Sequence, residues 1–260
     1  MVIDFIKENG ENSSENINSL KPNFVPQGYV LKKVKVAKPK LELEKTDKEG
    51  LLQGIMKDGR KYSVRENRMK FFMPDIWLKF KEALGSKRAK FTAEVLIQLG
   101  CRINEARHIE NRDVDYERNT LTLRVTKCKA KKGETKGKPR TIPINSDFAK
   151  QLKKYFSTGH SKLNILSTCG FNIALKKSLQ KIGVKDYYMY SAHNIRKSHG
   201  FWLKVMSHLR LMDIDAAEIC LRLGHDFQTY LLSYGSPGIL NNQDVMIVQQ
   251  VLGDLYQARR

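Results

Sequence analysis

The chain is poor in cysteine and has no long apolar segment, and each shortage excludes a class of protein. Its four cysteines stand far apart, with no Cys-x-x-Cys pair and no cysteine–histidine spacing of the kind that binds zinc. No apolar run reaches the roughly 18 residues that a membrane span requires. The first eight residues (MVIDFIKE) lack the basic segment and long apolar stretch of a signal peptide. We therefore expect an intracellular protein with reduced thiols, no structural zinc and no membrane association.

Acidic residues are also scarce relative to basic ones. The 260 residues include 47 Lys and Arg against 27 Asp and Glu, which gives a formal net charge of +20. Such an excess repels itself in the compact state and favours a polyanionic partner. A nucleic acid fits best, and the alternatives are a merely soluble basic protein or one that meets acidic membranes. The hydrophobic fraction of 41% is sufficient for a proper core.

The first 70 residues differ in pattern from the rest. Residues 9–19 are polar and poor in apolar side chains, which predicts a disordered or loosely held arm. From Lys32 to Lys48, lysines alternate with apolar residues, as in one or two strands or in a charged linker interrupted by Pro39. An Asp-Gly turn signal at Asp58 predicts a hairpin there.

The remainder reads as mainly α with a small three-stranded antiparallel sheet, an α+β fold. Apolar residues at helical spacing predict helices at 74–84, 87–99, 104–109, 146–156 and 171–182, with others beginning at Ser191 and Asp213 and an amphipathic tail at 242–257. Gly100 suits the end of one helix, and Ser146 and Ser191 suit the N-caps of two others. The three strands are expected at 114–116, 120–126 and 141–144.

Two arginines, two histidines and a tyrosine follow one another in an order that suits metal-free cleavage of a phosphodiester. They occur in Gly100-Cys101-Arg102-Ile103-Asn104-Glu105, in His193-Asn194-Ile195-Arg196, in Leu223-Gly224-His225 and at Tyr234. Arginine forks can hold a phosphate, histidines can move protons, and a tyrosine hydroxyl can attack phosphorus. The attack builds negative charge on the non-bridging oxygens, which arginines stabilise without deprotonating.

Each segment alone is a weak signal. His193 and Arg196 lie three residues apart on one helix face, and Ser191 would place His193 in the first turn, where free N–H groups favour a phosphate. A single His-x-x-Arg pair is more often structural, and a single histidine is more often a core or capping residue. Glu105 is expected to orient a neighbour or cap the turn rather than to react.

The ordered set resembles the tyrosine recombinases of the phage-integrase family. The family's Gly-x-Arg-x-x-Glu, His-x-x-Arg and Leu-Gly-His segments are matched in order, with a tyrosine nine residues after the last histidine. The resemblance implies a phosphate clamp of Arg102 and Arg196, acid–base roles for His193 and His225, and a 3′-phosphotyrosyl intermediate on Tyr234. It implies no metal, nucleotide or other cofactor. Tyr230 is the rival nucleophile, although its position five residues after the last histidine suits packing better.

The resemblance also implies a lysine in the β-hairpin that protonates the leaving 5′-oxygen. Lys127, at the end of a predicted strand, is the best match, and Lys129 is the alternative because strand alternation places it on the same face. The basic residues of this segment are expected to contact DNA backbone phosphates, and they are Lys129, Lys131, Lys132, Lys136, Lys138 and Arg140.

The match covers residues 74–240 and departs from the family at the N-terminus. Family members usually carry a separate helical domain that closes a clamp around the duplex. Here residues 1–70 are expected to form a basic arm or reduced DNA-binding region, as in compact archaeal or mobile-element integrases, before a catalytic domain at 71–240. Residues 241–260 are expected to form a C-terminal helix that docks on the same body or is exchanged with the next protomer in a tetramer.

The sequence therefore predicts a site-specific recombinase or integrase that acts on duplex DNA, in the cytoplasm and associated with the nucleoid. A type IB topoisomerase, which uses related chemistry, is one alternative, and the spacing between Leu-Gly-His and tyrosine argues against it. A DNA-binding protein that kept the scaffold and lost catalysis is the other. The joint presence of Arg102, Lys127, His193, Arg196, His225 and Tyr234 argues against that alternative.

Overall fold

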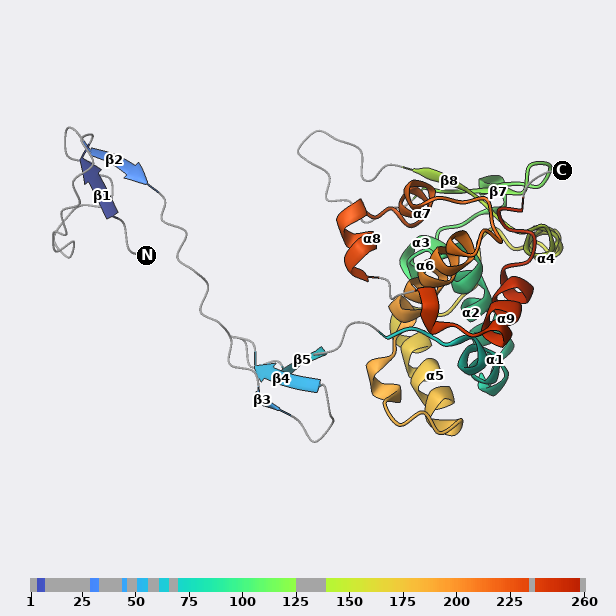
Figure 1. The fold of residues 1–260 in the computed structure, drawn as a ribbon, viewed down its shortest axis with the longest axis horizontal. Coiled ribbons are helices and arrows are strands. Elements are labelled where there is room, and N and C mark those ends of the chain that lie inside the picture. Colours follow the sequence, from blue (N-terminus) through green and yellow to red (C-terminus); the bar gives the residue numbers. More distant parts are fainter. Residues whose placement is uncertain are drawn as a thin grey trace. The chain divides into compact units, whose positions relative to one another are not determined.

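The computed structural model describes residues 70–124, 139–233 and 237–257, together with five strands nearer the N-terminus (Figure 1). The chain divides into two units, Met1–Val64 and Arg65–Arg260. The second unit is mostly helical with one small antiparallel sheet, so the predicted fold class is confirmed. Among the described residues, no helix combines the length and apolar character needed to cross a bilayer.

The N-terminal strands form two small sheets. Strand β1 (Asp4–Lys7) pairs antiparallel with β2 (Tyr29–Lys32). Strands β3 (Glu44–Lys45), β4 (Leu51–Ile55) and β5 (Lys61–Arg65) form a three-stranded sheet in that order. Pairing of β4 with β5 agrees with the hairpin predicted around Asp58. The turn itself and the polar segment 9–19 lie outside the described residues.

The second unit is built around two long helices, α2 (Lys87–Leu99) and α6 (Ala192–His208), which pack against each other. The other helices surround this pair (Figure 1): α1 (Pro74–Ala83), α3 (Ile103–Ala106), α4 (Ser146–Ser157), α5 (Thr168–Lys181), α7 (Ala216–Leu223), α8 (Phe227–Ser233) and α9 (Asn242–Leu252). The sheet lies at one edge of the body and consists of β6 (Val114–Asp115), β7 (Thr120–Leu123) and β8 (Arg140–Pro143), in that order.

A fully buried aromatic cluster holds α1 to α6. Trp77, Phe80, Phe201 and Trp202 are each 0% exposed. The rings of Trp77 and Trp202 meet edge to face, with centroids 6.2 Å apart, which is the favoured geometry for aromatic pairs. Burial of each large apolar side chain contributes about 1.5–3 kcal/mol, so this cluster stabilises the packing of α1 against α6, the helix that carries His193 and Arg196.

A glycine fixes the end of α2 next to α6. Gly100 adopts φ 59°, a left-handed conformation that suits glycine. A Cβ atom added there would lie 2.3 Å from Cδ2 of His199. His199 is itself wholly buried, with Nδ1 2.6 Å from the Ile97 carbonyl and Nε2 accepting from Arg222 Nε at 2.8 Å. Burial and the neighbouring Arg222 charge hold its pKa well below the usual range, so the ring is neutral.

The predicted cap of the 146–156 helix was wrong by one residue. The side chain of Asn145, not Ser146, accepts a hydrogen bond from the Phe148 N–H at 2.6 Å. Asn145 is buried and also donates to Gln98 Oε1 and to the Leu252 carbonyl, both at 3.1 Å. These tertiary partners select Asn145 over the adjacent serine, which is an equally good cap by type.

Three other predicted boundaries also differ from the structure. Helix α5 begins at Thr168, before the predicted 171, because the Ser167 side chain caps it. Helix α7 begins at Ala216, later than the predicted Asp213, because Asp215 is the residue that caps it. Helix α3 ends at Ala106, short of the predicted 109. Helices α5 and α7 thus start where a capping side chain satisfies a free N–H group.

The C-terminal segment docks on its own body. Leu252 and Leu255 are buried, and α9 packs against α1. Gln98 Nε2 donates to the Val251 carbonyl at 2.6 Å, which ties α9 to the end of α2. This is one of the two placements expected for the helix, and exchange with a second protomer stays a prediction.

Candidate active site

The segment after α2 positions Arg102 and Glu105. Because Gly100 ends α2, the chain turns and α3 starts at Ile103, with Arg102 as its N-cap residue. The Glu105 carboxylate accepts from the Arg102 backbone N–H and from its Nη1, both at 2.9 Å. Glu105 therefore caps the turn and orients a neighbour, which confirms both expectations. The Arg102 side chain remains 32% exposed, so its guanidinium reaches the surface of the site.

Arg196 joins three segments that are far apart in the sequence. Its side chain lies on α6 and is 1% exposed. Nη1 donates to the Gly100 carbonyl at 2.8 Å, while Nη2 donates to the Leu223 carbonyl and lies 2.8 Å from His225 Nε2. The guanidinium also lies 4.0 Å from the Glu105 carboxylate. Its position is thus fixed before any ligand arrives, as electrostatic stabilisation of a transition state requires.

His225 follows the turn that ends α7. Gly224 there adopts φ 61°, and the next residue brings its imidazole against Arg196. Because arginine can only donate, Nε2 of His225 is the acceptor and the proton sits on Nδ1. Burial, and then the charges of Arg196 and Arg102, lower the pKa of His225 to about 3. The ring is therefore neutral at physiological pH.

His193 occupies the first turn of α6. Ser191 and Asn194 form a capping box there, as predicted for Ser191. Loss of hydration, and then the charges of Arg196 and Lys197, lower the pKa of His193 to about 4. The residue nevertheless keeps an exposed surface at the rim of the site. A bound anion would reverse the effect of these charges.

Arg102, Glu105, His193 and Arg196 line one cavity of about 660 Å³. His225 is not among its lining residues and is joined to it through its contact with Arg196. The walls of the cavity come from the α2–α3 turn and from the first turns of α5 and α6, whose N–H groups favour anions. Arg107 and His108, which none of the motifs contains, also line it and are exposed. Their sequence signal is their position two and three residues after Glu105, which ends the Gly-x-Arg-x-x-Glu segment.

The predicted nucleophile and hairpin lysines are not among the described residues. They are Tyr234, Lys127, Lys129, Lys131, Lys132, Lys136 and Lys138. The rival Tyr230 is described, and it is 7% exposed. Its ring stacks on Phe227, with the Lys204 ammonium 5.5 Å from the ring centroid, and burial raises its pKa. A packed tyrosine with a raised pKa is poorly suited to attack.

Arg140, predicted to contact DNA, faces the protein interior. Its side chain is 13% exposed and pairs with Glu105 at 2.8 Å. The signal was present in the sequence, because Ile142 lies two residues on and shares the same strand face, and Ile142 is buried. A contact between Arg140 and DNA stays a prediction, whereas its contact with Glu105 was missed.

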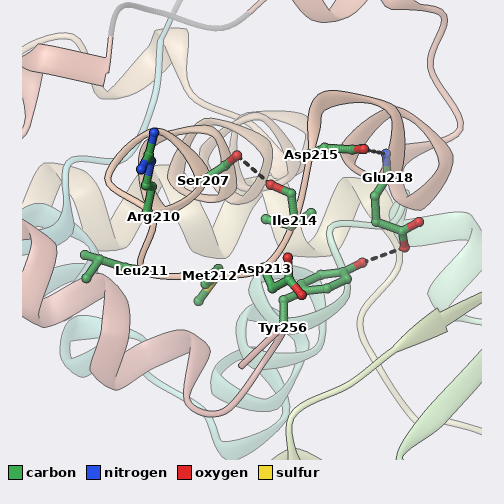
Figure 2. Close-up of a pocket in the computed structure, with 9 residues that line it drawn as sticks. All are labelled: Ser207, Arg210, Leu211, Met212, Asp213, Ile214, Asp215, Glu218 and Tyr256. Atoms are coloured by element: carbon green, nitrogen blue, oxygen red, sulfur yellow. Dashed lines mark hydrogen bonds between the residues drawn. The ribbon is translucent and has the colours of Figure 1, made fainter. Parts of the chain in front are cut away.

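A larger cavity, of about 740 Å³, lies between the α6–α7 connection and the C-terminal segment (Figure 2). None of the described candidate residues lines it. Figure 2 shows Tyr256 of the C-terminal segment donating to Glu218 Oε1, a hydrogen bond of 3.1 Å. Asp213 and Asp215 add negative charge to the same wall, which makes it a poor place for a phosphate. Across the described residues, no group of three or more acidic, histidine or cysteine side chains is arranged to hold a metal ion.

A family model for the phage integrase family matches residues 75–226. Comparison with curated proteins gives no significant match. Among solved structures, the chain is similar to the Tn1549 transposon integrase in complex with a circular intermediate DNA. That match has a TM-score of 0.50 and 11% identity, and covers 72% of this chain and 67% of the other. It is also similar to the XerA recombinase, with a TM-score of 0.48 and 17% identity over 70% of this chain and 64% of the other.

Proposed function

Since the chain belongs to the phage integrase family, we propose that it is a site-specific DNA recombinase or integrase that cleaves and rejoins duplex DNA through a tyrosine. The observation that best supports this is the position of Arg196. One buried guanidinium connects the segments that carry Arg102, His193 and His225. The three sequence motifs, separated by up to about 120 residues of chain, thus meet at one guanidinium, which also lines the cationic cavity.

In the proposed reaction, the Tyr234 hydroxyl attacks the scissile phosphorus. A 3′-phosphotyrosyl bond forms, the bond to the 5′-oxygen breaks, and Lys127 supplies the proton to that leaving oxygen. Arg102 and Arg196 stabilise the charge on the non-bridging oxygens. A free 5′-hydroxyl of the partner strand then attacks the phosphotyrosine, which re-forms the phosphodiester and releases Tyr234.

The two histidines suit proton transfer because both are neutral. His193 is exposed, so its imidazole can accept the proton that Tyr234 loses. His225 carries its proton on Nδ1, because its Nε2 accepts from Arg196, and in the proposed reaction it donates that proton to a phosphate oxygen. The low pKa values of about 4 and about 3 rise when the phosphate anion enters and offsets the arginine charges.

Duplex DNA is the proposed partner, and a tetramer of protomers on DNA is the proposed assembly. The net charge of +20 and the cationic cavity support the first. The Tn1549 integrase, to which the fold is similar, was solved in complex with DNA. The tetramer is carried over from the resemblance to the family, with α9 as the helix to be exchanged between protomers.

A covalent-trap assay in EDTA tests the function. The protein would be incubated with DNA from its own genomic neighbourhood, denatured, and probed for protein–DNA adducts. We expect an adduct with the wild type and with Tyr230→Phe, and none with Tyr234→Phe, whose DNA affinity should be nearly unchanged. An adduct that survives Tyr234→Phe moves the nucleophile elsewhere.

The same assay separates the two alternatives. Tight DNA binding with no adduct in the wild type would indicate a catalytically silent binder. Relaxation of supercoiled DNA of any sequence, accompanied by adduct formation but by no strand exchange between two sites, would indicate type IB topoisomerase activity. Sequencing the attached DNA gives the target site.

A further inference from the structure

Arg140 lies between the two halves of the candidate site. Its Nη2 donates to Glu105 Oε2 at 2.8 Å, and its Nε donates to the Arg222 carbonyl at 2.9 Å. The side chain is only 13% exposed. Unlike Arg102 and Arg196, Arg140 does not line the cavity of the candidate site, and two of its donors hold protein groups.

The first partner of Arg140 is the Glu105 carboxylate, which orients Arg102. Glu105 Oε2 accepts from Arg140 and from the Arg102 backbone N–H, while Oε1 accepts from the Arg102 guanidinium. The Glu105 side chain is 3% exposed. Removal of Arg140 would leave a buried carboxylate with fewer donors and freedom to turn. The Arg102 fork would then lose its fixed position, and a misplacement of about 1 Å can cost roughly 100-fold in rate.

The second partner of Arg140 lies in the last turn of α7. Carbonyls at a helix C-terminus have no partner within the helix. Here Arg140 binds the carbonyl of Arg222, and Arg196 binds the next one, that of Leu223. The turn that follows places His225. An added Cβ at Gly224 would lie 3.3 Å from Arg140 Nη1, so the arginine packs closely against this turn.

We propose that Arg140 is a positioning residue that sets Arg102 through Glu105 and His225 through the end of α7, without itself touching DNA. The inference rests on the proposed function. Because Arg140 is also the first residue of β8, the same side chain anchors that strand of the sheet to both halves of the site.

The same sheet offers a matched control. Arg124 directly follows β7, and it forms an ion pair with Asp113, whose side chain is 2% exposed. Arg124→Gln and Arg140→Gln therefore each remove one arginine from a buried carboxylate at neighbouring positions of the sheet. Only Glu105, the partner of Arg140, contacts a residue of the predicted clamp.

The test is single-turnover adduct formation on nicked DNA, with DNA affinity measured against salt. We expect Arg140→Gln to slow adduct formation about 100-fold, while the slope of log affinity against log salt stays at the wild-type value. Arg124→Gln should slow it less than about tenfold, as a change remote from the reacting groups. Arg140→Lys, which keeps the cation but not the fork, should recover part of the rate.

The pH profile gives a readout that a merely structural role would not move. Burial would raise the pKa of Glu105, but the hydrogen bond and charge of Arg140 outweigh it and lower the pKa. In Arg140→Gln the carboxylate should therefore take up its proton at higher pH, which moves the acid limb of the cleavage profile upward. Arg140→Lys should move it back towards the wild type, whereas Arg124→Gln should leave it in place.

Two results would overturn the inference. A salt slope lowered by about 0.9 in Arg140→Gln would show that Arg140 contacts a phosphate. Equal reductions of the rate of adduct formation in Arg124→Gln and Arg140→Gln would show that Arg140 only stabilises the sheet.

If Arg140→Gln does not fold, Arg140→Lys is compared with the wild type instead. If the wild type forms no adduct, the proposed function fails instead. A double-mutant cycle of Arg140→Gln with Glu105→Gln on unfolding then decides the connection, and absence of coupling refutes it.

Discussion

The two arginines of the predicted clamp are embedded differently, and their substitutions should separate activity from stability. Arg102→Ala should lower adduct formation by about 10²–10³-fold, as for loss of one oxyanion donor, with a smaller loss of stability than Arg196→Ala, because the Arg102 side chain is 32% exposed and only one of its side-chain donors binds Glu105. Arg196→Ala should lower it as strongly and also destabilise the fold by about 1–3 kcal/mol or more, because buried carbonyls lose their donor. Urea unfolding and single-turnover assays measure the two effects.

Arg118→Ala is the control for these substitutions. Its side chain is 81% exposed and pairs only loosely with Asp115, at 3.9 Å, so neither property should change. Equal destabilisation by Arg102→Ala and Arg196→Ala would contradict the difference in their burial.

The two histidines of the site predict how the stability of the folded protein depends on pH. The folded-state pKa values of about 3 for His225 and about 4 for His193 lie below the usual 6.5. Between pH 6.5 and those values the unfolded chain binds more protons than the folded one. The stability due to the neutral rings is thus complete above pH 6.5 and is lost progressively as pH falls towards the folded-state values.

Imidazole NMR titration of the free protein and of its DNA complex measures these pKa values. We expect both rings to stay neutral at pH 5 in the free protein, and both pKa values to rise when DNA binds, with uptake of protons at that pH. A pKa near 6.5 for either ring in the free protein would contradict the effect of burial and of the arginine charges on these two histidines.

Among the elements, α4 offers a paired test of helix capping. Asn145→Ala should destabilise the protein by about 1–2 kcal/mol for the lost cap, and by more because its amide also binds Gln98 and the Leu252 carbonyl. Ser146→Ala, the adjacent residue that sequence type favours equally, should stay within about 0.5 kcal/mol of wild type. Denaturant unfolding of the two variants decides which residue is the cap, and a reversed order would restore Ser146.

Local signals account for the elements that the sequence predicted well. Helices α2 and α6 have strong apolar spacing, Gly100 ends one and Ser191 caps the other, and all of this is visible within a few residues. The choice of Asn145 over Ser146 was not visible, because it depends on partners at Gln98 and Leu252 that only the folded chain brings near.

The candidate site shows the same division. Arg102 and Arg196 stand in short motifs, so their presence in one candidate site was predictable from the sequence. The inward orientation of Arg140 was readable from strand alternation with Ile142, but its two partners were not, since they lie 35 and 82 residues away along the chain. Contacts between motifs, rather than the motifs themselves, required the structure.

For the whole molecule, the placement of the C-terminal helix governs how stability depends on concentration. Leu252 is 0% exposed, so Leu252→Ala should destabilise the protein by about 2–5 kcal/mol. If α9 docks on its own body in solution, as in the structure, the unfolding midpoints of wild type and variant should not depend on protein concentration.

Chemical denaturation over a wide range of protein concentration measures this. A midpoint that rises with concentration would show that the helix is exchanged between protomers without DNA. Met246→Ala is the control, because Met246 lies on the same helix and is 69% exposed, and it should leave the midpoint unchanged.

The contact of Gly100 with His199 restricts how this chain can change over generations. An alanine at position 100 would collide with the His199 ring, and a smaller residue at position 199 would relieve the collision. That change would in turn leave Arg222 Nε, buried and bound to His199 Nε2, without its acceptor. Reversion of Gly100→Ala therefore requires simultaneous changes at positions 199 and 222. A library that randomises positions 100, 199 and 222 one at a time should return only the original residues.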